Sequence, residues 1–173
     1  AQIGMDHFAL PTDELAVAQR EGRLHRNFMG YTVMPAADQL GFGITAIGDV
    51  RGAFVQNRKK LVGYYEALDA GLLPVERGYL LDDDDKIRRH VILRLMCNVS
   101  VDTAEVESRF GIRFADYFAV ELEELKVPQE SGFVRMTPGR IEVTDRGRLF
   151  IRNIGMIFDR YLRAKRSGDT QVF

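Results

Sequence analysis

Metal-binding side chains are scarce in this sequence of 173 residues, which has one cysteine and three histidines. The single thiol, Cys97, cannot form an internal disulfide or hold an iron–sulfur cluster by itself, and so low a cysteine content is typical of a reducing compartment. The histidines (His7, His25 and His90) are far apart and do not have the spacing of a zinc motif. The sequence therefore predicts no complete metal site. Cys97 lies in an apolar stripe and is interpreted as a core residue.

Long hydrophobic runs and an excess of one charge are also missing. No apolar run approaches the roughly 20 residues of a membrane helix, and the first ten residues lack the basic start and apolar stretch of a signal peptide. Lys and Arg number 24 against 25 Asp and Glu, and this balance argues against a surface built mainly to bind nucleic acid. Hydrophobic residues make up 46%, enough for a packed core, so we expect a folded cytoplasmic protein.

The hydrophobic pattern changes near residue 56. Residues 1–55 have short apolar runs punctuated by glycines, which predict strands at 2–5 and 28–34 around a helix capped by Thr12. Three glycines in the apolar run 40–48 suit a strand end whose backbone approaches a ligand closely. From residue 56 to residue 173 the apolar spacing is mostly helical, with a connection expected at the segment Pro74–Leu81.

Residues 83–165 read as three helices, a β-hairpin and a closing helix, which is a winged-helix-like order. One of the helices is expected over 114–125, and a Pro-Gly turn predicts the hairpin near 133–143. The closing helix is expected to bury Leu149 and Phe150. The chain is therefore predicted to be α+β and mostly helical.

Two polar groups near the N-terminus have both a functional and a structural interpretation. Asp6 and His7 are adjacent at a strand end, where neighbouring side chains point to opposite faces, so we interpret them as a structural pair rather than a dyad. Four basic side chains follow the first helix and could attract a polyanion or be merely solvated: Arg20, Arg23, His25 and Arg26.

Several strings of the chain carry a specific resemblance. The longest are IGMDHFA at 3–9 and DELAVAQREGRLHRNF at 13–28. Shorter strings continue toward the C-terminus: GYT at 30–32, LGFG at 40–43, IRR at 87–89, FADYFA at 114–119 and GRLFIRNI at 147–154. In these strings the chain closely resembles the C-terminal part of the oxygen-independent coproporphyrinogen III oxidases, radical S-adenosylmethionine (SAM) enzymes of heme biosynthesis.

The resemblance implies a fold and a missing metal centre. The family folds as a partial (β/α) barrel with a mostly helical C-terminal domain, so residues 1–55 would be the last strands of the barrel and 56–173 the helical domain. The family's [4Fe–4S] cluster is bound by a CxxxCxxC loop in the early barrel, which has no counterpart here. We therefore expect this chain alone to bind no cluster, to cleave no SAM and to have no turnover.

The resemblance also implies the reaction and the partners of the intact enzyme. A 5′-deoxyadenosyl radical takes hydrogen from two propionates of coproporphyrinogen III in turn, and each loses CO2 to become vinyl, giving protoporphyrinogen IX. The substrate is thus a porphyrinogen, the electron donor or acceptor is unidentified, and the enzyme is expected to be a monomer without membrane or nucleic-acid partners. The carboxylates of the porphyrinogen could be bound by the four basic side chains Arg20, Arg23, His25 and Arg26.

A second SAM in the family contacts positions that correspond to Met29 and Ile47. Ile47 agrees with the family, whereas a glutamine is usual at the position of Met29. A thioether cannot donate the hydrogen bond of an amide, so the side chain of Met29 departs from the expected SAM contact.

Two alternatives come from other functional classes. Basic residues outnumber acidic ones by nine to three between residues 135 and 166, which together with the winged-helix-like order is compatible with a module that binds DNA or docks on a protein. A homologue that has lost catalysis could instead bind porphyrin or heme, with Met29, Met34 and the histidines as candidate ligands.

Overall fold

The computed structural model describes residues 1–166, which divide into two compact units. Unit 1 comprises residues 1–33 and the chain from residue 87 onward, and unit 2 comprises residues 34–86. The division differs from the predicted boundary near residue 55 because strand β6 (Ala53–Asn57) pairs with strands on both sides of it in the sequence. The last seven residues of the predicted domain 56–173 lie outside the described residues.

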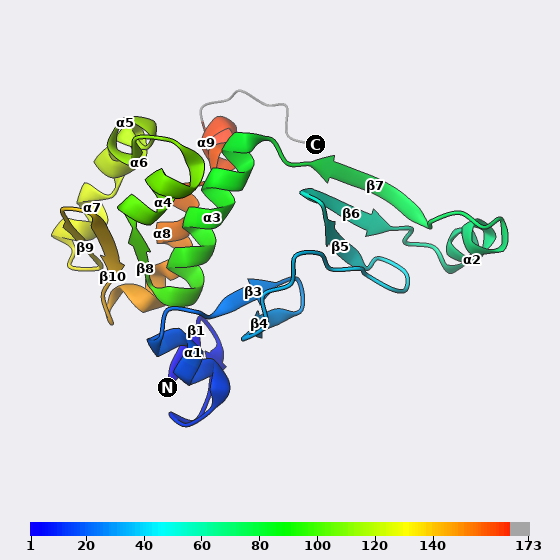
Figure 1. The fold of residues 1–173 in the computed structure, drawn as a ribbon, viewed down its shortest axis with the longest axis horizontal. Coiled ribbons are helices and arrows are strands. Elements are labelled where there is room, and N and C mark those ends of the chain that lie inside the picture. Colours follow the sequence, from blue (N-terminus) through cyan, green and yellow to red (C-terminus); the bar gives the residue numbers. More distant parts are fainter. Residues whose placement is uncertain (167–173) are drawn as a thin grey trace. The chain divides into compact units, whose positions relative to one another are not determined.

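Unit 1 begins with two small hairpins and a helix (Figure 1): β1 (Gln2–Gly4), β2 (His7–Phe8), α1 (Glu14–Arg20), β3 (His25–Asn27) and β4 (Gly30–Thr32). Strand β1 pairs with β2 and β3 with β4, both antiparallel. The predicted strand at 28–34 is therefore shorter and forms the second arm of a hairpin. The cap of α1 is Asp13 rather than Thr12, because the Asp13 carboxylate accepts a 2.9 Å hydrogen bond from the Leu15 amide.

The remainder of unit 1 is mostly helical and contains one small sheet. Its elements are α3 (Asp83–Asn98, whose first four residues are grouped with unit 2), β8 (Ser100–Asp102), α4 (Thr103–Phe110), α5 (Phe114–Tyr117), α6 (Ala119–Glu124), α7 (Lys126–Glu130), β9 (Val134–Thr137), β10 (Arg140–Val143), the 3-10 helix η1 (Gly147–Phe150), α8 (Ile151–Ile157) and α9 (Arg160–Arg166). The hairpin β9–β10 confirms the prediction near 133–143, and β8 adds a third antiparallel strand in the order β8-β10-β9.

Two helices expected to be continuous are broken. The helix predicted over 114–125 is split into α5 and α6, with α7 following at residue 126, and the closing helix is split into η1, α8 and α9. The 3-10 turn of η1 has three residues per turn instead of 3.6, which rotates its side chains away from the apolar stripe of α8. Leu149 is accordingly 75% exposed and Phe150 43% exposed, so the prediction that both are buried was wrong.

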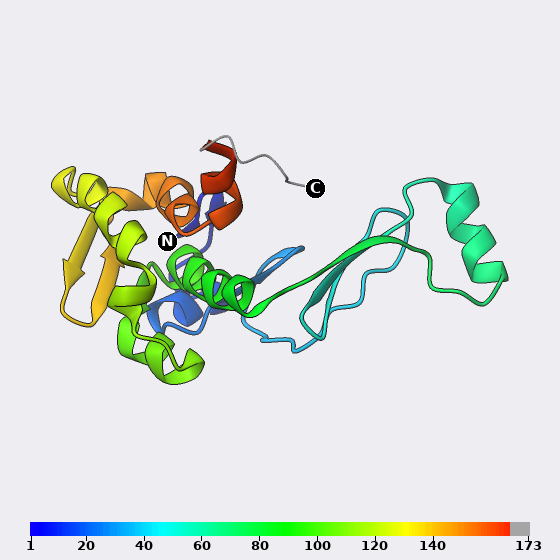
Figure 2. The same ribbon diagram turned by 90° about the horizontal axis from the view of Figure 1, so that it is seen from above.

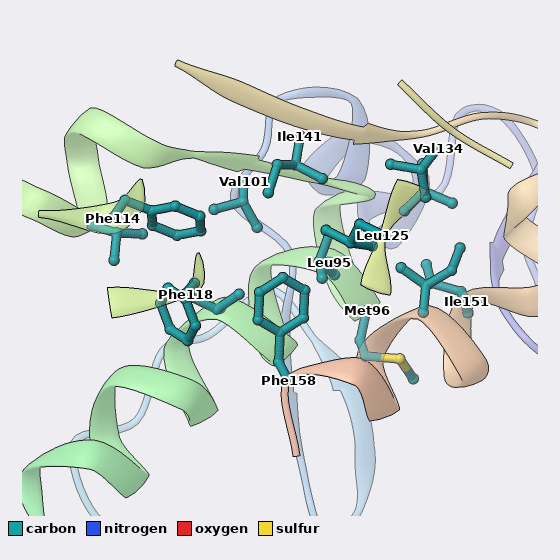
Figure 3. Close-up of a cluster of buried hydrophobic side chains, with 14 of the residues drawn as sticks. Leu95, Met96, Val101, Phe114, Phe118, Leu125, Val134, Ile141, Ile151 and Phe158 are labelled. Atoms are coloured by element: carbon teal, nitrogen blue, oxygen red, sulfur yellow. The ribbon is translucent and has the colours of Figure 1, made fainter. Parts of the chain in front are cut away.

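The core of unit 1 lies among α3, the helices α5 to α8 and the inner face of the three-stranded sheet. Figure 3 shows Phe114, Phe118 and Phe158 packing toward Leu95 and Val101. Phe118 and Phe158 are fully buried, and their rings meet edge to face with centroids 5.4 Å apart. A second, smaller cluster joins β1, α1 and the end of α3: Ile3, Ala16, Ala18, Leu24 and Cys97.

A buried ion pair crosses the first core. Glu121 is 1% exposed, and its Oε1 accepts hydrogen bonds of 2.6 Å from both Arg88 on α3 and Arg163 on α9. Burial raises the pKa of Glu121, but the two guanidinium hydrogen bonds outweigh it and the pKa lies below its ordinary value of 4.5. The three side chains therefore tie α3, α6 and α9 together.

Unit 2 is a three-stranded antiparallel sheet with one helix (Figure 2): β5 (Ile47–Val50), β6, α2 (Leu61–Asp69) and β7 (Val75–Leu80). The order is β5-β6-β7, so the segment 74–81, predicted to be a connection, is an edge strand instead. The hydrophobic residues of unit 2 are mostly exposed, and the buried ones are Ala67 and Leu81. Among residues 1–166, no helix has the length and apolarity to span a bilayer.

The glycines of the run 40–48 serve the packing of unit 2 itself. A Cβ on Gly41 would lie 2.9 Å from the Ile47 carbonyl oxygen, and one on Gly48 would lie 2.9 Å from that of Gln39. The side chain of Asn57 donates to the carbonyls of Gly41 and Gly43, each at 3.0 Å. At Gly41 and Gly48 the close approach is therefore to the chain's own backbone. At Gly43, where φ is +94°, a Cβ would meet open space.

Candidate functional site

The two hairpins of unit 1 bring together a polar cluster that surrounds Tyr31. His7 lies with its ring edge-on to the Tyr31 ring, with centroids 5.1 Å apart. The guanidinium carbon of Arg26 lies 5.5 Å from the centre of the same ring. The cluster of Asp6, His7, Arg26 and Tyr31 is thus built from β2, β3, β4 and the turn that precedes β2.

Asp6 and His7 form a hydrogen-bonded pair, with Asp6 Oδ1 2.9 Å from His7 Nδ1. The expectation that they point to opposite faces fails because Met5 and Asp6 form the turn between β1 and β2 and are not part of a strand. The pKa of Asp6 lies below its ordinary value of 3.8, because its carboxylate accepts a backbone hydrogen bond and one from His7, with a further contribution from the Arg152 cation. The arrangement orients the imidazole and leaves Nε2 for another partner.

Tyr31 is fixed by a close approach to the backbone of β1. A side chain at Gly4 would collide with the Tyr31 hydroxyl, so only glycine allows the ring to lie there. The hydroxyl is buried and has no hydrogen-bond partner among residues 1–166, and the same is true of Arg26 Nε. Burial raises the pKa of Tyr31, and the nearby Arg26 opposes the rise. Sequence reasoning missed Tyr31, although it lies in the string GYT.

The four basic side chains predicted to act together do not converge. Arg20 donates to the Pro11 carbonyl at 2.8 Å, and Arg23 pairs with Glu21 at 2.5 Å on the exposed surface. His25 and Arg26 are neighbours on β3 and therefore point to opposite faces of the hairpin. Of the four, Arg26 is the one that joins the cluster around Tyr31.

The two positions predicted to contact SAM belong to different units. Met29 lies in the turn between β3 and β4 and is 87% exposed, and its amide donates to Asn27 Oδ1 at 2.8 Å. Ile47 begins β5 and pairs with Gln56 on β6. Each residue is partly or largely accessible, and each is held by a short hairpin.

Cys97 is buried, with 1% of its surface exposed, which confirms its interpretation as a core residue. Burial raises the pKa of its thiol to about 11, so the thiol stays protonated near neutral pH. One protonated, buried thiol does not fit an iron–sulfur cluster, which needs three thiolates in the motif the resemblance implies. Across residues 1–166, no group of three or more His, Cys, Asp or Glu side chains is placed to hold a metal ion.

The basic C-terminal residues do not form one continuous charged face. Arg163 is bound to the buried Glu121, and Arg148 donates to the Gln2 carbonyl at 3.1 Å and to Gln19 at 3.2 Å. Both cations are therefore used inside unit 1. These two guanidinium groups are therefore less available to the DNA-binding alternative.

Comparison with known proteins gives consistent results. The family model described as HemN C-terminal domain matches residues 81–150. The chain is 50% identical over 167 residues to an oxygen-independent coproporphyrinogen III oxidase of Synechocystis sp. and 50% identical over 163 residues to that of Escherichia coli K12. Each alignment covers 94% of this chain and 36% of the relative. A relative in Thermostichus vulcanus is 47% identical over 97% of this chain and 52% of its own length.

The fold agrees with a solved structure. Coproporphyrinogen III oxidase (HemN) from E. coli, described as a radical SAM enzyme, matches 92% of this chain with a TM-score of 0.89 and 49% sequence identity. The match covers 37% of that protein, so this chain spans little more than a third of the E. coli and Synechocystis relatives. The resemblance drawn from the sequence strings is confirmed: over nearly its whole length, the chain is similar to the C-terminal part of the oxygen-independent coproporphyrinogen III oxidases.

Proposed function

We propose that this chain is the C-terminal segment of an oxygen-independent coproporphyrinogen III oxidase, which converts two propionates of coproporphyrinogen III to vinyl groups. The observation that carries the proposal is the 50% identity to such oxidases over 94% of the chain. The TM-score of 0.89 supports the same assignment from the fold. Within this proposal, residues 1–55 contribute the last strands of a partial barrel, and residues 56–173 form the helical domain with its winged-helix-like hairpin.

The cluster around Tyr31 is the best supported place for a contact between this segment and the substrate. Arg26 is a half-buried cation, stacked on an aromatic ring, with its Nε unsatisfied. A carboxylate of the porphyrinogen would satisfy that guanidinium with a charge-assisted hydrogen bond. Arg20 and Arg23 already have partners, so we propose a smaller role for them. His25, on the other face of β3, remains a weaker candidate.

The SAM contacts proposed for this segment are at Met29 and Ile47. Met29 and Ile47 would make apolar contacts with SAM, because neither side chain donates a hydrogen bond. Radical generation requires a cluster held by three thiolates, and this chain has one cysteine. The segment on its own is therefore proposed to be inactive, and the electron donor or acceptor, the monomeric state and the cytoplasmic location are proposed for the intact enzyme.

A chimera tests the proposal. The C-terminal 36% of the E. coli oxidase is replaced by this chain, and anaerobic conversion of coproporphyrinogen III to protoporphyrinogen IX is measured after cluster reconstitution. We expect the chimera to be active and the isolated chain to be inactive. The visible absorbance of the reconstituted cluster reports whether the chimera has folded. A chimera that binds its cluster but does not convert the substrate would overturn the proposed function.

Two variants of the chimera test the residues. Replacing Arg26 by Gln is expected to raise KM for the porphyrinogen by about tenfold, because one charged hydrogen bond is lost. The matched control, Arg23→Gln, removes a cation of the same string that already pairs with Glu21 and should leave KM nearly unchanged. Equal effects of the two substitutions would contradict the role given to Arg26.

A further inference from the structure

An open groove in unit 1 lies away from the cluster around Tyr31 and has a volume of about 520 Å³. It is lined by the outer face of the three-stranded sheet and by the segment that leads into η1. Because side chains alternate along a strand, Val143 and Ile141 face the core while Glu142 and Arg140 alternate with them. The volume is in the range of pockets that bind small molecules.

Three arginines from separate segments point their charges at this groove. Arg135 comes from β9 and Arg140 from β10, and both lie beside Glu142, with N···O distances of 3.5 Å and 2.8 Å. Arg140 also donates to Ser100 Oγ at 3.4 Å. The third, Arg146, lies over the ring of Phe133 at 5.8 Å. Within residues 1–166, the side chain of Arg146 has no ion-pair or hydrogen-bond partner.

The charges of the groove do not cancel. Glu142 is shared by Arg135 and Arg140 and neutralises one of their two charges, and Arg146 adds another. Asp145 also lines the groove and lies 3.5 Å from Arg148, which does not line it. Three arginines and two carboxylates line the groove, so one positive charge remains, and the planar fork of arginine matches the oxygens of phosphates and carboxylates.

We infer that this groove binds a small anion with paired oxygens, such as a phosphate monoester or a carboxylate, through Arg135, Arg140 and Arg146. The two ligand types share the chemistry of paired anionic oxygens. The inference is independent of the proposed function, because none of these residues belongs to the cluster around Tyr31. The ligand would contact Arg146 directly and share Arg135 and Arg140 with Glu142.

The test is an NMR titration of the full 173-residue chain with inorganic phosphate and, separately, with succinate. We expect saturable shifts of the Ser100 and Arg146 signals with at least one of these probes, and the stronger binder identifies the ligand type. Arg146→Gln should weaken binding by about tenfold, as loss of a charged hydrogen bond predicts. Arg135→Gln, on an exposed side chain, is a second variant should the first fail to fold.

The control is Arg113→Gln, which removes an exposed arginine of unit 1 that pairs with Asp116 and does not line the groove. It should bind as the wild type does. Shifts that do not saturate, or that are the same in all variants, would overturn the inference. A duplex oligonucleotide that shifts the same signals at lower concentration than phosphate, with steep salt dependence, would also overturn it in favour of a nucleic-acid surface.

Discussion

Unit 1 and unit 2 are each stabilised internally by a different kind of interaction. Unit 1 buries a large cluster of aliphatic and aromatic side chains and a paired carboxylate at Glu121. Unit 2 depends on the backbone ladder of β5, β6 and β7 and on the hydrogen bonds of Asn57. It leaves many large hydrophobic side chains exposed: Met34, Leu40, Phe42, Ile44, Leu61, Val62, Tyr65, Leu68, Leu72, Leu73, Val75 and Leu80.

The difference shows that regular secondary structure and a hydrophobic core are separate properties. Hydrophobic burial is the main favourable term in folding, and each buried large side chain contributes about 2 kcal/mol. Unit 2 has a regular sheet yet buries little, so we expect it to open more readily than unit 1. Its exposed side chains also suit a segment that is covered in a longer protein, which agrees with the proposed function.

The largest expected effect comes from emptying the core of unit 1. Phe118→Ala removes a fully buried ring and should lower the free energy of unfolding by about 3–5 kcal/mol, measured by urea unfolding. The matched change in unit 2, Phe42→Ala, alters a residue that is 86% exposed and should cost less than about 0.5 kcal/mol. Similar losses of unfolding free energy in the two variants would contradict the contrast drawn between unit 1 and unit 2.

The ion pair is the next test. Glu121→Gln leaves Arg88 and Arg163 without their shared carboxylate and should destabilise unit 1 by about 3 kcal/mol. Glu123→Gln, whose partner Lys126 is on the surface, should change stability by less than about 1 kcal/mol. Thermal unfolding followed by circular dichroism distinguishes the two variants.

The same carboxylate predicts a dependence on pH. The folded pKa of Glu121 is below its ordinary value of 4.5, so its contribution is complete above about pH 4.5 and is lost as the pH falls through the folded pKa. The wild type should lose stability in this acid range more steeply than Glu121→Gln. Parallel pH profiles would show that the pair contributes nothing.

Two buried asparagines allow a finer comparison. Asn57 in unit 2 donates to Gly41 and Gly43, while Asn98 in unit 1 exchanges two hydrogen bonds with the backbone of Leu24. Replacing either by Ala should cost about 1–3 kcal/mol locally. We expect hydrogen exchange to accelerate throughout β5–β7 in Asn57→Ala but only around Leu24 in Asn98→Ala. If the acceleration of hydrogen exchange were confined to the mutated site in both variants, the expectation that unit 2 opens as a whole would be contradicted.

The smallest expected effect concerns the exposed pair in unit 1. His7→Gln should raise the pKa of Asp6 toward its ordinary value of 3.8, because one of its hydrogen bonds is changed. Arg152→Gln should raise it less, since that cation acts only through space. NMR titration of the carboxyl carbon measures both, and a larger shift for Arg152→Gln would contradict the assignment.

Local patterns were sufficient to predict some elements and not others. The helical spacing of α3 and the Pro-Gly turn of β9–β10 depend on residues close in sequence, and both elements are present. Strand β7 was missed because Val75–Leu80 has no clear alternation, and its pairing with β6 comes from a distant segment.

The candidate site was predictable only in part, for the same reason. The resemblance located the relevant strings, but the Asp6–His7 contact depends on a turn that the strand pattern concealed. Tyr31 has a role only because Gly4, on another hairpin, leaves room for its hydroxyl. Such contacts between distant residues have no signature in composition or periodicity.

Because Cys97 is buried, the rate at which its thiol reacts can report local unfolding. It is the one cysteine of the chain, and an alkylating reagent attacks the thiolate, which the native environment suppresses. Pulse-labelling with iodoacetamide would thus time how often the end of α3 becomes accessible, without any engineered probe. A second cysteine placed on the surface of unit 2 would react at once, giving a reference within the same molecule.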